Sequence, residues 1–172
     1  DYPILQGEDN LSYINTDVYG SFALAGSIFL DSRCDNTFHD AYALVYGHHM
    51  DNGRMFGDLD KYKDGKFFGE NSAGALILPD RSYKLEIFAC MLVPAAEGRI
   101  FDTQMRQTDI GGLIDFAEAE AVHLSPDTVE AARGAESPQI IALSTCSSEY
   151  TDARTIVLAY MTPYTTETQV GG

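Results

Sequence analysis

The chain has 172 residues, of which 45% are hydrophobic, so it can bury one substantial core and its length requires no second domain. Its 11 Lys and Arg stand against 26 Asp and Glu, and the formal net charge of -15 repels phosphate backbones and anionic lipid surfaces alike. Nucleic acid is therefore not expected as a partner. A peptide with a basic tail would be attracted, although high acidic charge more often serves solubility alone.

No window approaches the ~20 uninterrupted apolar residues that a membrane helix needs, and the chain opens at Asp1 with neither Met nor an apolar signal segment. That opening is compatible with an anchoring segment that lies outside this chain. We expect one domain over residues 1–172, with a loosely held polar tail at about residues 165–172.

Strands are expected to dominate the domain. The opening residues, about 1–20, are predicted to form a helical cap, because Asp9 and Asn10 are helix-capping residue types that precede the apolar Leu11. After them come short apolar stretches with β-branched and aromatic residues, separated by Gly, Asp, Asn or Pro, which predict a mainly β fold. The clearest predicted strands cover residues 21–30, 41–46, 76–78, 83–93, 139–145 and 155–160.

Two later segments have helical spacing. Residues 55–62 present Phe56, Leu59 and Tyr62 on one side of a short helical turn, just after a turn signal at Asn52 and Gly53. Residues 109–122 repeat apolar side chains on one face and carry their acidic side chains elsewhere. We therefore expect a helix that interrupts the strand series before residue 139.

The three cysteines, Cys34, Cys90 and Cys146, are odd in number and lack CxxC spacing, so neither a disulfide framework nor a zinc knuckle is indicated. Cys90 lies within an apolar run at 85–93, where a small buried thiol is the ordinary interpretation. A bridge between Cys34 and Cys90 stays open, because spacing alone does not predict pairing.

Cys146 follows the apolar run at 140–143 and precedes a polar stretch, so it lies where a buried strand ends. A nucleophilic thiol needs a fixed sulfur, access for its substrate and a nearby positive group that favours the thiolate. A strand end supplies the first two. Taken alone, however, such a cysteine is more often one further residue at the edge of the core.

Two histidines, His48 and His49, follow a strand-like run that ends in Gly47. If the strand persists, adjacent residues point to opposite faces, so at most one of them is expected to face a shared site. Paired histidines in a loop are more often surface residues or opportunistic metal ligands. His39 and His123 offer no helical i, i+4 relation and no Cys-rich cluster, so no dedicated metal site is expected.

Arg154 begins the strand-like run that follows the polar stretch after Cys146. If the two flanking runs pair as neighbouring strands, the short connection returns the guanidinium to the side of the sulfur. A fixed positive charge there could hold a substrate carbonyl or stabilise the oxyanion of a tetrahedral intermediate. An isolated Arg would otherwise be interpreted as a surface or ion-pair residue.

Together these residues resemble the sortase family, whose members carry a catalytic His, a Cys at the end of a TLxTC-like strand and an Arg that begins the next strand. The counterpart here is ALSTC at residues 142–146, with Ala where the family often has Thr. The segments QGEDN (6–10), GSIFLD (26–31), YGHHM (46–50) and MFGDL (55–59) are similar to the class B signature in its usual order. The helix over 109–122 also resembles one that class B members insert before the Cys strand. The resemblance covers roughly residues 4–161.

The resemblance implies a closed, eight-stranded β-barrel with peripheral helices and a cysteine transpeptidase activity that needs no metal or organic cofactor. Cys146 would be the nucleophile, His48 the general acid and base, and Arg154 the group that holds the carbonyl oxygen. His48 directly follows a Gly, as in the family, whereas His49 stands where the family often has Asn. Ser144 and Thr145 are candidate substrate contacts, although strand alternation should turn one of them inward.

The same resemblance implies the partners and the place of action. The acyl donor would be the sorting-signal peptide of a secreted surface protein, and the acceptor an amine on a cell-wall peptide or on a pilin lysine. The enzyme would work at the extracellular face of the cell membrane, held by an N-terminal anchor outside this chain. Anchoring and pilus assembly are both compatible with the sequence.

Two more distant interpretations compete. A papain-like protease is disfavoured because the Cys lies after the His in the sequence and no partner segment with an Asn stands out. A noncatalytic cell-surface β-barrel that binds peptide would fit the strand pattern alone. Retention of His48, Cys146 and Arg154 together favours the enzyme.

Overall fold

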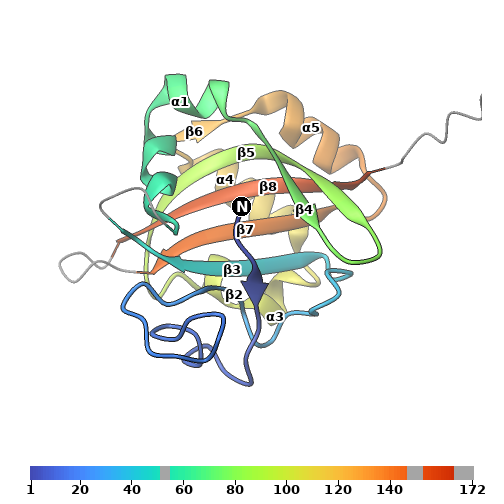
Figure 1. Cartoon of the computed structure of the whole chain (residues 1–172). Coiled ribbons are helices and arrows are strands. Elements are labelled where there is room, and N and C mark those ends of the chain that lie inside the picture. The colour runs from blue at the N-terminus through green and yellow to red at the C-terminus, as the bar shows by residue number, and fades with distance from the viewer. Residues whose placement is uncertain (51–54, 147–152, 165–172) are drawn as a thin grey trace, which may run out of the picture.

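One eight-stranded sheet forms the body of the molecule, in the order β1-β2-β3-β7-β8-β5-β4, with β6 paired to β5 (Figure 1). The computed structural model describes residues 1–50, 55–146 and 153–164. The strands are β1 Ile4–Leu5, β2 Ile28–Leu30, β3 Tyr42–His48, β4 Ala73–Ile77, β5 Ser82–Pro94, β6 His123–Leu124, β7 Gln139–Cys146 and β8 Ala153–Pro163. The helices are the 3-10 helix η1 Gly57–Lys63 and the α-helices α1 Gly65–Glu70, α2 Gly98–Phe101, α3 Thr103–Arg106, α4 Ile110–Glu120 and α5 Pro126–Gly134.

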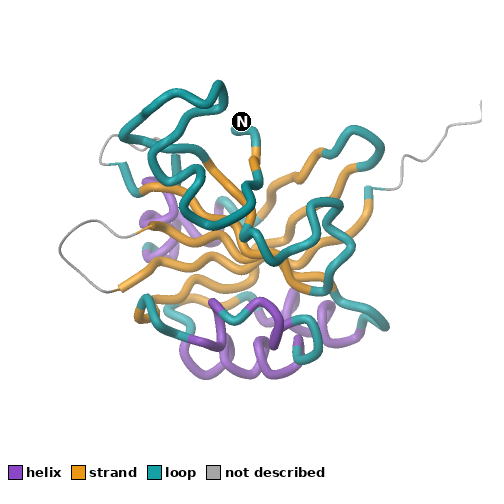
Figure 2. Tube along the Cα trace, turned by 90° about the horizontal axis from the view of Figure 1, so that it is seen from below, coloured by secondary structure: helices purple, strands orange, loops and turns teal. Residues whose placement is uncertain are grey.

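The central strands β3, β7 and β8 are buried on both faces, which explains their nearly continuous apolar runs. Ile140 and Ile141 of β7 are 0% and 1% exposed although they point to opposite faces, and Ile156 and Val157 of β8 are fully buried. Helices gather along one side of the strands, and the long loop of the N-terminal part lies on the other (Figure 2). Strand ends at the middle of the sheet are therefore held by a rigid core.

Helix α4 covers part of that core through Leu113, Ile114 and Ala117, which are buried. Its first turn is capped by Asp109, whose side chain accepts a hydrogen bond from Gly112 N–H. The helix predicted over 109–122 is thus confirmed. Along the described part of the chain, no helix is long and apolar enough to cross a membrane.

The prediction of a mainly β fold with eight strands is confirmed, but the prediction of a closed barrel is wrong. Strands β1 and β4 are the two edges of the sheet, and no strand pairing joins them within the described residues. Strand β1 has only two residues and follows Pro3, which has no N–H to extend the ladder. A pocket of about 480 Å³, lined by residues of both edge strands such as Ile4 and Leu76, separates them.

The predicted N-terminal helical cap is also wrong, because residues 6–27 fold as successive turns. The Asp9 carboxylate accepts hydrogen bonds from Leu11 N–H and Ser12 N–H, both at 2.9 Å, and the Asp17 carboxylate bonds the backbone of the next turn in the same way. Short polar side chains that bond nearby backbone groups compete with helix formation. The strand predicted from residue 21 accordingly shortens to Ile28–Leu30.

The remaining predicted strands are confirmed as β3, β4, β5, β7 and β8, with ends that shift by a few residues. The helical turn predicted over 55–62 is η1. Sequence patterns missed β1, β6 and the helices α1, α2, α3 and α5, although Ser125 and Pro126 are a helix-start signal for α5. The predicted turn at Asn52 and Gly53 and the predicted loose tail at 165–172 lie outside the described residues.

Candidate active site

Three neighbouring central strands, β3, β7 and β8, carry the predicted site residues at or near their ends. Strand β3 pairs with β7 in parallel, and their last pair sets His48 beside Cys146. Strand β7 pairs with β8 in antiparallel fashion as far as Ser144 and Ile156, and Arg154 lies on β8 two residues beyond that last pair. His48 and Arg154 therefore come from the two strands that pair with β7, near the end of β7 that carries Cys146. The side chain of Cys146 and residues 147–152 lie outside what the structure describes.

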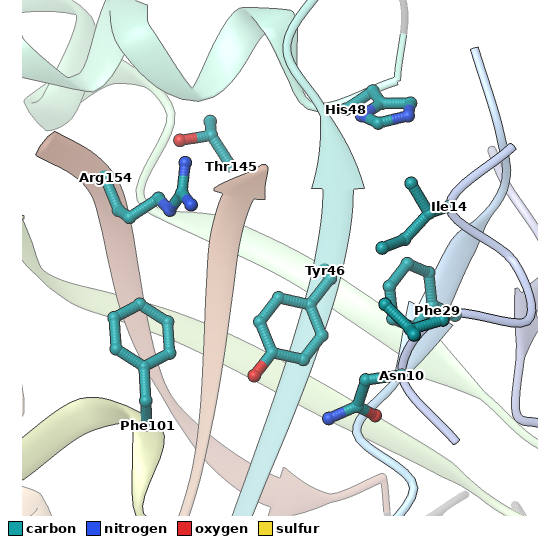
Figure 3. A pocket seen from close by; sticks show the side chains of 9 residues that line it. Asn10, Ile14, Phe29, Tyr46, His48, Phe101, Thr145 and Arg154 are labelled. Carbon is teal, nitrogen blue, oxygen red and sulfur yellow. The ribbon is translucent and has the colours of Figure 1, made fainter. Parts of the chain in front are cut away.

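A pocket of about 430 Å³ opens beside these strand ends (Figure 3). His48, Thr145 and Arg154 line one end of it, and apolar or aromatic side chains form most of the rest. Concave, largely apolar pockets with a few polar groups are the usual form of a ligand site. Its lining residues are Asn10, Leu11, Ile14, Phe29, Tyr46, His48, Phe101, Thr145 and Arg154.

Close packing at Gly47 fixes the backbone that carries His48. A Cβ atom at Gly47 would lie 2.6 Å from a ring carbon of Phe56, so a larger residue would displace that ring. The chain returns at this point, and Phe56 N–H donates a hydrogen bond of 2.9 Å to the His48 carbonyl oxygen. Packing against Phe56 therefore explains the Gly at position 47, and the next residue, His48, lies at the pocket.

The Arg154 side chain is partly buried and extends toward Thr145 at the end of the pocket (Figure 3). Its Nη1 atom is buried and has no hydrogen-bond partner in the part of the chain that the structure describes. A buried donor without a partner costs free energy, so an oxygen atom of a bound ligand would be stabilised there. The guanidinium is thus suited to hold a carbonyl oxygen or an oxyanion.

Comparison with known proteins identifies the family. No family model matches the chain. Sortase B of Listeria monocytogenes is 34% identical over 150 residues, a match that covers 87% of this chain and 58% of that protein. The solved class B sortase of Streptococcus pyogenes that is involved in pilus biogenesis is 33% identical, with a TM-score of 0.81 over 94% of this chain and 85% of that one. The chain belongs to the class B sortases.

The Staphylococcus aureus sortase B–substrate complex has the same fold as this class B sortase, with a TM-score of 0.81, 26% identity and coverage of 95% of this chain and 74% of that chain. The family predicted from the ordered sequence segments is therefore confirmed. This chain spans little more than half of the length of the L. monocytogenes relative, 58%.

The two residues before Cys146 occupy different surroundings in this class B sortase. Ser144 is fully buried, and its hydroxyl donates to the Thr145 carbonyl oxygen at 3.2 Å. Thr145 lines the pocket, and its Oγ1 accepts a hydrogen bond of 3.1 Å from Thr155 N–H. Contact of either residue with substrate stays a prediction.

Cys34 and Cys90 are both free and buried, so they form no bridge with each other. Burial raises the pKa of each thiol to about 11. A buried thiol with a raised pKa is inert as a nucleophile near neutral pH. Neither cysteine therefore competes with Cys146 for a chemical role.

Asp31 does not line the pocket itself but binds two residues that do. It is fully buried, and its carboxylate accepts hydrogen bonds from Asn10 Nδ2 at 2.9 Å and from the Tyr46 hydroxyl at 3.0 Å. Arg33 pairs with it at 2.8 Å and also donates to the Phe101 carbonyl oxygen at 2.9 Å. Burial opposes the charged form, but the hydrogen bonds and charge of Arg33 outweigh it and hold the pKa of Asp31 below its usual value.

We expect Asp31→Asn to lower the free energy of unfolding by about 1 to 3 kcal/mol at pH 7, because it leaves Arg33 without its anionic partner. Since the folded pKa of Asp31 is lowered, its charge stabilises the fold above the unfolded value of about 4, and this contribution is lost as the pH falls through the folded value. The difference between parent and variant should therefore shrink in acid. Urea denaturation at pH 7 and below pH ~4 measures it.

A matched control is Asp80→Asn, which removes an exposed ion pair to Arg81 at 2.8 Å. Exposed pairs contribute little, so a change within about 0.5 kcal/mol is expected. Equal effects of the two substitutions would contradict a special role for Asp31.

Sequence reasoning missed several residues that line the pocket or, like Asp31, support its lining. Asp31, Asn10 and Tyr46 belong to segments that resemble the class B signature, yet nothing in the sequence showed that they meet. Phe101 comes from the unpredicted helix α2 and carried no signal. Across residues 1–50, 55–146 and 153–164, no three His, Cys, Asp or Glu side chains come close enough together to hold a metal ion.

Proposed function

We propose that this class B sortase is a cysteine transpeptidase that cleaves a C-terminal sorting motif after Thr and transfers the acyl group to an amine. The observation that supports the proposal is that His48 and Arg154 lie on the two strands that pair with β7, with His48 directly beside position 146. The pocket of about 430 Å³ beside these strand ends supports a peptide substrate. The family membership of the chain supports the reaction class.

In the first half-reaction the Cys146 thiolate attacks the carbonyl carbon of the motif Thr, and a C–S bond forms. The Arg154 guanidinium donates hydrogen bonds to the oxygen that becomes negative in the tetrahedral intermediate. His48, as imidazolium, gives its proton to the nitrogen of the departing peptide as the C–N bond breaks. A thioester between Cys146 and the donor peptide remains.

In the second half-reaction an amine attacks the thioester carbonyl. The neutral His48 accepts a proton from the attacking nitrogen, a new amide bond forms, and Cys146 leaves as the thiolate. The enzyme returns to its starting protonation state, so the two half-reactions balance without a cofactor. Arg154 serves the oxyanion in both steps.

The donor in this proposal is the sorting-signal peptide of a secreted surface protein, which the enzyme meets at the outer face of the cell membrane. A solved S. aureus relative is a complex with its substrate, which supports a peptide donor for this chain. The net charge of -15 would attract a donor with a basic tail at low ionic strength. An N-terminal anchor outside this chain would hold the catalytic domain near its substrates.

Two acceptors are compatible with the proposed chemistry. A cell-wall peptide amine would make the enzyme an anchoring transpeptidase, which is our first proposal. The S. pyogenes class B sortase that this chain resembles is involved in pilus biogenesis, which favours a pilin lysine as the second candidate. The two differ in the amine that resolves the same thioester.

Mass spectrometry of reactions with fluorogenic sorting peptides tests the proposal most directly. Peptides with several motifs are incubated with the protein alone, with a short peptide that carries a free N-terminal amine, and with a lysine-containing peptide. We expect a mass adduct on Cys146 that equals the peptide up to the motif Thr. The amine-containing reactions should instead yield a ligated product, and the preferred acceptor separates anchoring from pilus assembly.

Absence of an adduct and of cleavage with every motif, while the protein is folded, would argue for a noncatalytic peptide-binding protein. Binding can be measured in the same samples by fluorescence anisotropy. Tight binding without turnover would support that alternative, and hydrolysis without transfer to either amine would contradict the transpeptidase.

A further inference from the structure

One carboxylate, that of Asp60, contacts the residues that directly follow His48 and Arg154 in the sequence. Asp60 lies in η1, and its carboxylate accepts a hydrogen bond from the hydroxyl of Thr155, the residue after Arg154. On its other side, Asp60 Oδ2 lies 3.4 Å from Nδ1 of His49, the residue after His48. One side chain therefore links the end of β3 to the beginning of β8.

The strand between them joins the same cluster. The β7–β8 ladder ends at the pair Ser144 and Ile156, and beyond it Thr155 N–H bonds the Thr145 side chain at 3.1 Å. Thr145 directly precedes Cys146. Asp60 thus contacts His49, the residue that follows β3, and Thr155 of β8 directly, and it reaches β7 through Thr155.

The surroundings favour a charged and fixed Asp60. Thr155 is 4% exposed, and Asp60 and His49 keep only 35% and 22% of their side-chain surface exposed. Lys63 Nζ lies 2.9 Å from Asp60 Oδ1. Burial opposes the charged form, but the hydrogen bonds from Thr155 and Lys63 outweigh it and lower the pKa of Asp60.

We propose that Asp60 is a positioning residue for the transpeptidase reaction, which holds His48 and Arg154 in fixed relation to Cys146 by binding their chain neighbours from η1. The inference rests on the proposed function, because only a reaction at Cys146 makes this geometry matter. Asp60 is absent from the residues that line the pocket, so its effect is expected on the chemical step rather than on peptide binding.

The chain offers a closely matched control. Asp58 lies in the same 3-10 helix, and its carboxylate pairs with Lys61 at 2.9 Å in an i, i+3 relation, as Asp60 pairs with Lys63. Within the described residues Asp58 has no hydrogen bond or ion pair to β3 or β8, and its side chain is 50% exposed. Asp58→Asn and Asp58→Ala therefore remove the same charge without the link between strands.

We expect Asp60→Ala to lower kcat for peptide cleavage by about 10- to 100-fold, the range for small misplacements of catalytic groups, with KM within about twofold of the parent. Thr155→Val removes the hydroxyl at similar volume and should also lower kcat. Thr155→Ser keeps the hydroxyl, so its kcat should be close to that of the parent. Asp58→Ala should match the parent. Kinetics are measured well below the melting temperature and normalised to folded protein.

Equal kcat values for Asp60→Ala and Asp58→Ala would overturn the inference, and so would a Thr155→Ser variant as slow as Thr155→Val. The pH dependence of Cys146 alkylation by iodoacetamide distinguishes failure of the positioning inference from failure of the proposed function. If the parent cleaves no sorting peptide, the proposed function fails, while a changed alkylation profile in Asp60→Ala alone still supports the positioning role. An unchanged profile in that case would overturn it.

Discussion

Cys146→Ala is expected to abolish acyl-enzyme formation and to reduce peptide cleavage by at least about 10⁴-fold, because loss of a nucleophile removes the covalent route altogether. The measurement is cleavage of a fluorogenic sorting peptide, together with intact mass after incubation with the same peptide. The parent should gain the mass of the acyl group, and the variant should not.

The other two cysteines provide the matched control for this substitution. Cys34→Ala and Cys90→Ala remove the same sulfur atom from buried positions. Both variants should keep the adduct and most of the activity, with at most a moderate loss of stability from the small cavity. Cleavage by Cys146→Ala at the rate of the parent would refute the assignment of the nucleophile.

His48→Ala is expected to lower the rate of transpeptidation by at least about 100-fold, the lower end for loss of a general acid and base, with little effect on folding. His48 lines the pocket on the strand that pairs with β7 at Cys146. The measurement is kcat/KM for cleavage and for transfer, with circular dichroism as the check on the fold.

His49→Ala is the natural comparison, because the sequence alone left both imidazoles as candidates for the general acid and base. His49 is absent from the pocket lining and lies 3.4 Å from Asp60. We expect a loss of less than about 10-fold, well below that for a general acid and base. The reverse order of the two effects would reassign the acid and base role to His49.

Much of this fold follows from local patterns. The apolar runs at 83–93 and 139–145 predict the long strands β5 and β7, because burial on both faces demands nearly continuous apolar sequence. The helical spacing at 109–122 likewise predicts α4. Whether the sheet closes into a barrel could not be predicted from these patterns. Closure depends on whether the two-residue strand β1 pairs with β4, which no local sequence pattern indicates.

The sequence predicted the candidate catalytic residues, but it did not predict the residues that hold them in place. The segment around Cys146 and the Gly before His48 are similar to family motifs, so these positions could be named from sequence. Asp31 ends a family-like segment and Asp60 follows another, but neither position indicated its contacts, because an acidic residue in an acidic chain is ordinarily solvated. Their roles depend on contacts with residues far along the chain, such as Tyr46 and Thr155.

The strand order has a consequence for the time course of folding. The two C-terminal strands, β7 and β8, fill the centre of the sheet between β3 and β5, which come much earlier in the chain. Pairing between sequence-distant strands carries a loop-closure cost and slows folding, here toward the millisecond-to-second range of β-rich domains. A growing chain that ends before residue 139 would therefore lack the centre of the sheet together with Cys146 and Arg154, so the core and the candidate site are completed by the same two strands.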